Sequence, residues 1–227
     1  FIITEINETF SGKPKSLIFE KNRKRYKEYD KKIIYNPITK KDLLELQKDY
    51  WSDYVSDLNK SISYKHNGKP PKYLKKSLRR EISHRDAAIL GFFKLASDED
   101  LILLSDLDEI PNPKTISKAI KKKFDCPHYF KMDWFLYWIN NKVSNPWFGT
   151  VLFRFKHLKG NSLDNLRFAS PKEQNVPGPI INNGGWHFSY LGGYEAIIYK
   201  LKSTQVLLFD PLPFNTGSTS TCGRAIM

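Results

Sequence analysis

The stretch LILLSDLDEIP, from Leu101 to Pro111, indicates the fold of this chain most clearly. Its first four residues form an apolar run of the length of a buried strand, and the proline ends the segment. Three carboxylates stand between them: Asp106, Asp108 and Glu109. Because ligands bind outside the carboxyl ends of strands in open α/β sheets, we expect these side chains to face a ligand crevice.

Asp106 and Asp108 are two residues apart, so they can point the same way. Two carboxylates this close repel each other unless a cation neutralises them. Their oxygens suit magnesium or manganese, which would cancel charge on a diphosphate leaving group. The alternative is an acidic strand end that caps the next helix. An Asp-x-Asp pair alone does not separate the two, and the apolar strand before it favours the metal.

Apolar runs of four to six residues alternate with longer helical patterns, which is typical of an α/β layer fold. We expect strands at residues 1–4, 32–35, 101–104, 128–132, 149–155 and 186–191. We expect helices at residues 41–59, 73–95, 113–124 and 194–202. Thr39 is placed to cap the first of these helices, and Pro113 stands at a first-turn position where proline is tolerated.

The pattern predicts one domain over residues 1–208 and an irregular tail over residues 209–227, where the periodicity is lost. The chain opens on residues 1–4, which already have the pattern of a buried strand. We therefore expect further chain before Phe1, and a signal or anchor would lie there.

Composition excludes several classes of protein. Of the 227 residues, 40% are hydrophobic and 14% aromatic, which is too many for an intrinsically disordered chain. The longest apolar run covers residues 87–93, far short of the about 20 residues that a membrane helix needs, so no span is expected within this sequence. Two cysteines, Cys126 and Cys222, are too few for a disulfide scaffold or a cysteine metal site, and their pairing stays open.

The net charge of +13 is concentrated in residues 21–32, 65–85 and 118–123. Such clusters suggest an anionic partner, although lysine-rich runs are also ordinary solvated helix faces. Zinc-finger spacing, an aromatic RNP pattern and basic-zipper heptads are all missing, so no nucleic-acid partner is expected.

Four segments in the same order resemble glycosyltransferase family 17. They are FIITEINETFSGKPKSLIFE at residues 1–20, RREISHRDAAILGFF at 79–93, LILLSDLDEIP at 101–111 and GGWHFSYLGG at 184–193. This is the family of the β-1,4-mannosyl-glycoprotein 4-β-N-acetylglucosaminyltransferase, which adds the bisecting N-acetylglucosamine to N-glycans. The resemblance extends from Phe1 to about Ser203 and ends before the tail.

The resemblance implies a GT-A type nucleotide-sugar transferase fold, with a mixed central sheet flanked by helices. It implies UDP-N-acetylglucosamine (UDP-GlcNAc) as donor, a glycan as acceptor, Mn²⁺ or Mg²⁺ as cofactor and inversion at the anomeric carbon. Animal members are Golgi-lumenal with an N-terminal anchor, whereas a microbial or viral member can be cytoplasmic, so the compartment stays open. The sequence does not indicate the oligomeric state.

The resemblance also assigns roles to individual residues. Asp108 matches the direct metal ligand, with Asp106 at the ribose or the metal. Glu5 matches the glutamate of the opening motif and would meet the nucleotide's base or ribose. Arg85 and Asp86 match a pair on the helix before the acidic strand, where Arg85 would steady the diphosphate.

Inverting transfer also needs a base that takes the proton of the acceptor hydroxyl. Asp133 and Glu195 are the candidates, with Glu109, which also belongs to the expected donor site, and Glu173 behind them. The alternative for Glu195 is a first-turn helix charge. His187, between two aromatic residues, is either a third metal ligand or diphosphate contact, or a hydrogen-bonded core residue.

Among the tryptophans, Trp147 and Trp186 are expected to be the most accessible and to stack on acceptor sugars, since indole offers a flat apolar face with a polar edge. Acceptor choice is expected in the loops at residues 61–71 and 140–148. Two other functions fit parts of the pattern. One is a phosphatase with an aspartate nucleophile, and the other is a non-catalytic basic module that binds nucleotides or nucleic acid.

Overall fold

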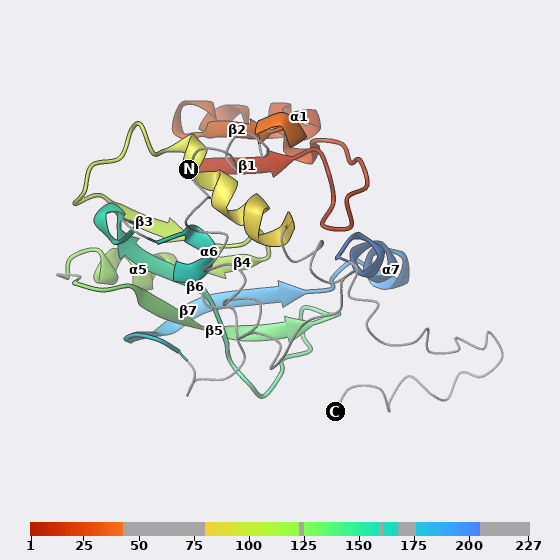
Figure 1. Cartoon of the computed structure of the whole chain (residues 1–227). Helices are drawn as coiled ribbons and strands as arrows, with labels where there is room; N and C mark the ends of the chain where they lie inside the picture. Colours follow the sequence, from red (N-terminus) through yellow and green to blue (C-terminus); the bar gives the residue numbers. More distant parts are fainter. Residues whose placement is uncertain (43–79, 123–124, 159–160, 168–175, 205–227) are drawn as a thin grey trace, which may run out of the picture.

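The computed structural model describes residues 1–42, 80–122, 125–158, 161–167 and 176–204. Within these residues the chain forms a mixed α/β fold with flanking helices, as predicted, but its strands form two sheets rather than one central sheet (Figure 1). The first sheet is the parallel pair β1 (Ile2–Ile6) and β2 (Ile34–Ile38). Between these strands run the helix α1 (Ile18–Asn22) and the 3₁₀ helix η1 (Arg23–Lys32).

The second sheet has five strands in the order β3, β6, β5, β7, β4. They are β3 (Leu101–Leu104), β4 (Glu109–Pro111), β5 (His128–Leu136), β6 (Trp147–Arg154) and β7 (Ile180–Ser189). Only β5 and β7 pair in parallel, and the other three pairs are antiparallel. Because β3 and β5 both run antiparallel to β6, strands β3, β5 and β7 share one direction. Their carboxyl ends therefore point the same way, with β5 and β7 ending side by side and β3 ending earlier, level with the start of β5.

Helices connect the sheets and cover them. The chain is helical at residues 80–86 and continues as the 3₁₀ helix η2 (Ala87–Gly91), which lies against the first sheet. There the Asn36 amide donates a hydrogen bond of 3.3 Å to the Ala87 carbonyl, and Ala87 is buried with Ile6 and Ile38. The remaining helices are α5 (Pro113–Ala119), the 3₁₀ helix η3 (Phe155–Leu158), α6 (Leu163–Leu166) and α7 (Gly193–Thr204).

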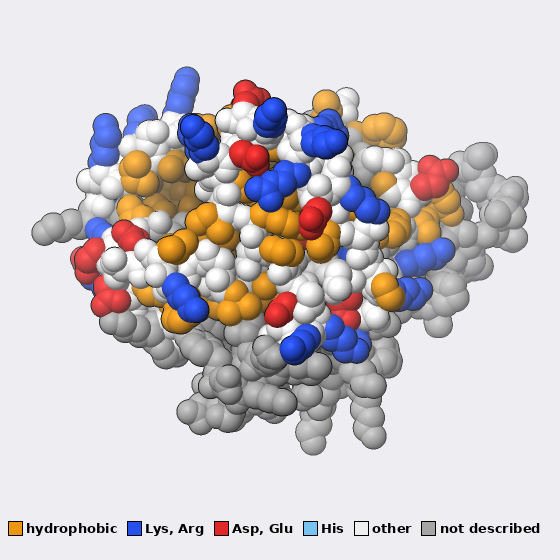
Figure 2. Space-filling view, turned by 90° about the horizontal axis from the view of Figure 1, so that it is seen from above, with side chains coloured by type: hydrophobic (Ala, Val, Ile, Leu, Met, Phe, Trp, Pro, Cys, Tyr) orange, Lys and Arg blue, Asp and Glu red, His pale blue; other side chains and the backbone are white. Residues whose placement is uncertain are grey.

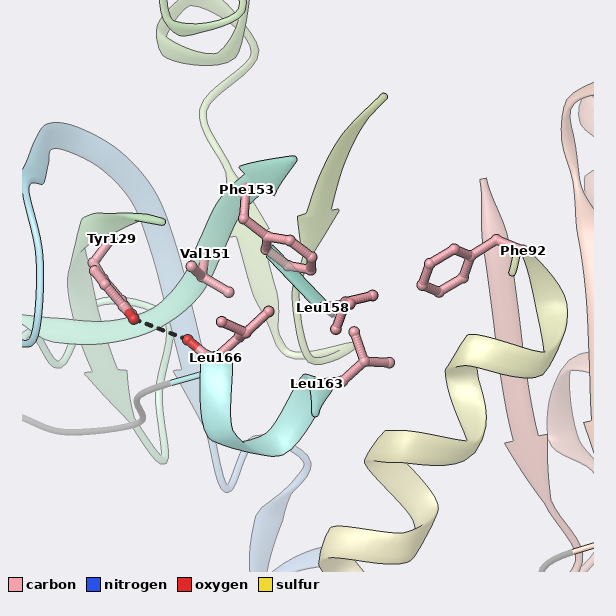
Figure 3. Close-up of a cluster of buried hydrophobic side chains, with 7 residues drawn as sticks. All are labelled: Phe92, Tyr129, Val151, Phe153, Leu158, Leu163 and Leu166. Carbon is pink, nitrogen blue, oxygen red and sulfur yellow. Dashed lines mark hydrogen bonds between the residues drawn. The ribbon is translucent and has the colours of Figure 1, made fainter. Parts of the chain in front are cut away.

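The main hydrophobic cluster joins the second sheet to the helix at residues 80–91. Figure 3 shows Phe92 pointing from the end of this helix toward Leu158 and Leu163. On the other side of the cluster, the Tyr129 hydroxyl donates a hydrogen bond of 3.0 Å to the Leu166 carbonyl. This contact fixes α6 to the sheet, which matters for the site because Arg167 follows α6 directly.

All six predicted strands are present, and all but β3 differ from the prediction in their bounds. Strand β7 begins at Ile180 rather than at residue 186, and the short strand β4 was not expected. The helix at 113–124 ends at Ala119, and the one at 194–202 runs from Gly193 to Thr204. The Asn112 side chain caps α5 by accepting a hydrogen bond of 3.0 Å from the Lys114 N–H, and Pro113 occupies the first turn.

Other predictions fall partly or wholly beyond the described ranges. These are most of the helix at 41–59, the first part of the helix at 73–95, the loop at 61–71, Glu173, Cys222 and the tail at 209–227. Thr39 and Asp42 are described and form a reciprocal cap, in which each side chain accepts a hydrogen bond from the other's backbone N–H. No helix in the described ranges is long and apolar enough to cross a membrane.

We define the first layer as the first sheet with α1 and η1. The positive charge is spread over the surface of this layer rather than gathered at one point. Figure 2 looks down on this layer and shows Lys and Arg side chains distributed among acidic and hydrophobic ones. Within η1, for example, Arg23 pairs with Asp30 at 3.2 Å. The basic run at residues 21–32 is thus an exposed helix face with some internal pairing.

Candidate active site

The acidic turn, which we define as residues 105–109, follows β3 and leads directly into β4. The Glu109 N–H donates to the Asp106 carbonyl at 3.0 Å and closes the turn, and the Phe188 N–H of β7 donates to the Asp108 carbonyl at 2.8 Å. The turn is thereby fixed beside the carboxyl end of β7. Leu107 at its tip is fully exposed.

Glu109 lies at the centre of this arrangement, and its carboxylate is fully enclosed. The groups that donate hydrogen bonds to it are Trp147 Nε1 (2.7 Å), Arg167 Nη2 (2.5 Å), Thr150 Oγ1 (3.2 Å) and the Asp106 N–H (3.1 Å). A Cβ at Gly149 would come within 1.8 Å of Glu109 Oε1, so only glycine leaves room for this carboxylate. We interpret Glu109 as the residue that positions the turn.

Asp106 is ion-paired to two arginines. Its carboxylate lies 2.7 Å from Arg167 Nη2 and 3.6 Å from Arg85 Nη2. Burial alone would raise the pKa of Asp106, but the two guanidinium groups outweigh it and hold that pKa below its ordinary value. Asp106 is therefore ionised at neutral pH, and the nearby arginines bring two positive charges to the acidic turn.

Arg85 is itself held by a buried acidic pair. Its guanidinium contacts the Asp164 carboxylate of α6, and the Asp86 carboxylate accepts a hydrogen bond of 2.9 Å from the Asp164 N–H. Burial raises the pKa of Asp86 to about 7. The predicted pair Arg85 and Asp86 thus lies at the site, with Arg85 facing Asp106 and Asp86 supporting α6 from behind.

Asp108 faces a lysine and a histidine. Lys200 Nζ of α7 lies 3.0 Å from Asp108 Oδ2, and His187 Nδ1 of β7 lies 3.8 Å from Asp108 Oδ1. His187 is buried against Trp147, with the two rings stacked at 4.4 Å, and its Nε2 is 2.7 Å from Ser189 Oγ. Its Nδ1 has no hydrogen-bond partner in the described part of the chain. Burial lowers the pKa of His187, so the imidazole is neutral at pH 7.

The fit of a metal ion depends on this pair. A carboxylate oxygen and a neutral imidazole nitrogen that lacks a partner are suitable ligands for manganese. In the described residues, however, no three His, Cys, Asp or Glu side chains are grouped so that they could hold a metal ion. Asp106, the third expected ligand, is turned toward Arg85 and Arg167 instead. Within the described ranges, the turn thus brings together two side chains of the ligand type, Asp108 and His187.

Glu5 belongs to β1, and its side chain reaches the start of α1. Its carboxylate accepts hydrogen bonds from the Ile18 and Phe19 N–H groups at 2.7 and 2.8 Å, and from the Tyr35 hydroxyl at 3.1 Å. These contacts satisfy free N–H groups at a helix start. Glu5 therefore has a structural role at the start of α1 that does not depend on a nucleotide.

The two candidate bases belong to different elements, Asp133 to β5 and Glu195 to α7. Asp133 on β5 is directly opposite Trp186 on β7 and pairs with Lys142 at 2.7 Å. The next pair along these two strands is Trp134 with His187. Because side chains alternate along a strand, Asp133 and Trp186 face away from His187. Glu195 is exposed in the first turn of α7.

The tryptophans differ in their accessibility. Trp186 is 38% exposed, whereas Trp147 directs its Nε1 to Glu109 and stacks on His187. Trp138, which was not expected to be among the most accessible tryptophans, is 67% exposed. Of the two expected acceptor contacts, Trp186 is thus the more accessible.

Sequence reasoning missed three charged residues of the site: Asp164, Arg167 and Lys200. Each comes from an element far along the chain from the acidic turn, and none stands in a motif. In a chain with 37 lysines and arginines, no local signal distinguishes Arg167 or Lys200 from the surface charges.

Comparisons with known proteins bear on one part of the chain. No curated protein and no solved structure gives a significant match. The model of glycosyltransferase family 17 matches residues 1–57, which include β1, α1, η1 and β2. This match names the same family that the four motifs resemble, and it covers residues 1–57, which include the first of those motifs.

Proposed function

We propose that this protein is an inverting glycosyltransferase that moves N-acetylglucosamine from UDP-GlcNAc to a hydroxyl group of a glycan, with its donor site at the acidic turn. The family match supports a glycosyltransferase. The observation that carries the location is the cluster of Asp106 and Asp108 with Arg85, Arg167 and Lys200 at the carboxyl ends of β3 and β7.

The charges of the cluster suit a nucleoside diphosphate. Three cationic side chains approach the two aspartates, and their pairs with them are at 2.7–3.6 Å. A diphosphate that enters here can take over contacts with Lys200, which is 40% exposed, while buried Arg167 stays with Glu109. Charge-assisted hydrogen bonds of this kind stabilise the charge that develops on the departing diphosphate.

Asp108 and His187 would hold the metal ion, and Asp106 would contact the ribose or complete the ligand set. When bound, manganese or magnesium supplies positive charge to the leaving diphosphate. Ser189 accepts or donates at His187 Nε2 and so orients the imidazole with Nδ1 toward Asp108. Trp147 stacks on the His187 imidazole and shields that face of the ring from water.

The base that takes the acceptor proton is expected on the exposed side of the site. Glu195 is our first candidate, because it lies on α7, the helix whose Lys200 contacts Asp108. Asp133 is the second, although it faces away from His187. The acceptor in family relatives is the mannose of N-glycans, and we carry this over as a proposal only.

The test is calorimetric titration of UDP and UDP-GlcNAc, with and without manganese, into the wild-type protein and Asp108→Asn. We expect manganese-dependent binding that weakens by about tenfold or more in the variant, since a lost charged contact costs about 1.5–3 kcal/mol. Asp30→Asn removes an equally charged but distant side chain and serves as the matched control.

Equal affinity in Asp108→Asn and in the wild type would contradict the proposed donor site. Failure of both nucleotides to bind the folded wild-type protein would contradict the proposed function, and phosphatase and nucleic-acid assays would then be the next measurements.

A further inference from the structure

The connection between β5 and β6 starts with a hairpin whose tip is apolar and exposed to solvent. Trp138 is 67% exposed, and the next residue, Ile139, is 72% exposed. Single exposed hydrophobic residues are ordinary on a protein surface, whereas contiguous apolar surface marks a place of contact. Two large apolar side chains in succession at the tip of a turn therefore need an explanation.

Hydrogen bonds within the hairpin hold this tip in place. The Leu136 N–H donates to the Asn141 carbonyl at 3.1 Å, and the Asn141 side chain donates back to the Leu136 carbonyl at 3.0 Å. The Asn141 N–H donates to the Trp138 carbonyl at 3.0 Å, and below the tip Phe135 forms a β-bridge with Lys142. Because the hairpin closes through its own backbone, the exposure of the two apolar side chains is a property of the fold.

The loop after β7 lies beside this hairpin and adds to the same surface. The Tyr137 N–H donates to the Ser189 carbonyl at 3.0 Å, and the rings of Tyr137 and Tyr190 are 5.9 Å apart. Leu191, which follows directly, is 36% exposed. We define the apolar rim as these side chains from the two loops: Tyr137, Trp138, Ile139, Tyr190 and Leu191.

The apolar rim lies in sequence without charge. Residues 134–141 and 188–194 contain no Asp, Glu, Lys or Arg, although these four types make up 27% of the whole chain. The charges that flank the hairpin, Asp133 and Lys142, pair with each other at 2.7 Å. Depletion of charge around exposed aromatic residues is typical of an interaction surface.

A lipid surface fits the apolar rim better than a protein partner does. The rim has five side chains, whereas a specific protein interface takes about 20–30 residues on each side. Tryptophan and tyrosine are enriched at the membrane–water interface, where the ring is apolar and its N–H or O–H stays with water and headgroups. The net charge of +13 also attracts the protein to negatively charged headgroups.

We propose that the apolar rim docks this protein on the surface of an anionic lipid bilayer, with Trp138 and Ile139 inserted at the level of the headgroups. Tyr137 and Tyr190 contact the headgroup layer beside them. Lysines and arginines elsewhere on the surface bring the protein to the membrane, and the inserted tip determines which side faces it. The inference goes beyond the proposed transfer reaction and does not rest on it, because no residue of the rim belongs to the proposed donor site.

The experiment is co-sedimentation of the protein with vesicles of phosphatidylcholine, alone or mixed with about one third phosphatidylserine. We expect saturable binding to the mixed vesicles. The double variant Trp138→Ala, Ile139→Ala should bind them about tenfold more weakly or worse, since its tip no longer removes two large apolar side chains from water. Leu95→Ala, at a residue that is also 67% exposed but lies outside the rim, is the control and should bind as the wild type does.

A second measurement tests insertion itself. Vesicle lipids that carry bromine on the acyl chain quench the fluorescence of a tryptophan that lies near them. We expect quenching of the wild-type protein and much less quenching of Trp138→Phe, which keeps an aromatic ring at the tip and should still bind. Both substituted side chains are exposed, so thermal unfolding of every variant should match that of the wild type.

Four results would overturn the proposal. The first is no binding of the folded wild type to the mixed vesicles, and the second is equal affinity of the double variant and the wild type. The third is equal quenching in Trp138→Phe and the wild type. The fourth is a dimer of the wild type in solution that the double variant does not form, which would assign the rim to a second copy of this chain.

Discussion

Glu109 and Asp108 are neighbouring carboxylates with opposite environments, and their environments separate their roles. Glu109 has no exposed side-chain surface and receives donors from three side chains and one backbone N–H. Asp108 keeps 33% of its side chain exposed and has Lys200 as its hydrogen-bond partner. A buried, saturated carboxylate holds structure, whereas an accessible one can exchange its partner for a ligand.

Asp86 is expected to make stability depend on pH. Burial raises its pKa from 3.8 to about 7, so the folded state binds this proton more tightly than the unfolded state. The free energy of unfolding therefore falls as the pH rises from about 4 to about 7, by a few kcal/mol in order of magnitude. Asp86→Asn should remove this loss, and urea unfolding between pH 4 and 8 measures it.

The titration of His84 changes the free energy of unfolding in the opposite direction. It cancels when Asp86→Asn is compared with the wild type, because both proteins contain His84. Burial lowers the pKa of His84 to about 4, so its contribution rises as the pH increases from about 4 to 6.5. We thus expect the stability of Asp86→Asn relative to wild type to increase with pH over this window. A constant difference across the window would show that Asp86 titrates at its ordinary pKa in the folded protein.

At the scale of secondary-structure elements, apolar runs predicted six of the strands but neither the short strand β4 nor the bulged first half of β7. Strand β3 has the bounds expected from its four apolar residues. Strand β4 was missed because three residues that end in proline carry no periodicity. The first half of β7 was missed because Asn182–Gly185 has the composition of a loop, although neighbouring backbone holds it in the sheet as a bulge.

The same contrast holds for the site. The acidic turn could be predicted, because an apolar strand followed by clustered carboxylates is a local pattern. The role of Arg167 could not be predicted. It depends on the contact between Tyr129 and α6, which are far apart in the sequence. Lys200 was placed on a predicted helix, but its partner Asp108 depends on how α7 packs.

Glu5 is expected to stabilise the first layer by capping α1. Glu5→Ala leaves the Ile18 and Phe19 N–H groups without their acceptor and should lower the free energy of unfolding by about 1–2 kcal/mol. Glu28→Ala, at an exposed glutamate of η1, is the matched control and should cost less than about 0.5 kcal/mol. Denaturant unfolding of both variants gives the comparison.

The Glu5 variant also addresses the role that the family resemblance implies. We expect its UDP affinity to equal that of the wild type under conditions where both proteins are folded. A weakened affinity without a loss of stability would contradict the capping account and assign Glu5 to the donor.

At the scale of the whole molecule, one edge of the five-stranded sheet collects the chemistry. The acidic turn follows β3, and side chains from four other parts of the chain meet at it: Arg85, Arg167, His187 and Lys200. The first sheet, which lies within the stretch that matches the family, packs on η2. The helix at 80–91 then carries Arg85 from that layer to the site.

The most direct test of the central claim is a crystal structure with UDP and manganese, with diffraction data collected at the manganese absorption edge. The account predicts an anomalous peak at Asp108 and His187, with the diphosphate beside Arg85 and Lys200. A nucleotide bound away from the acidic turn, or a manganese peak that neither Asp108 nor His187 contacts, would contradict it.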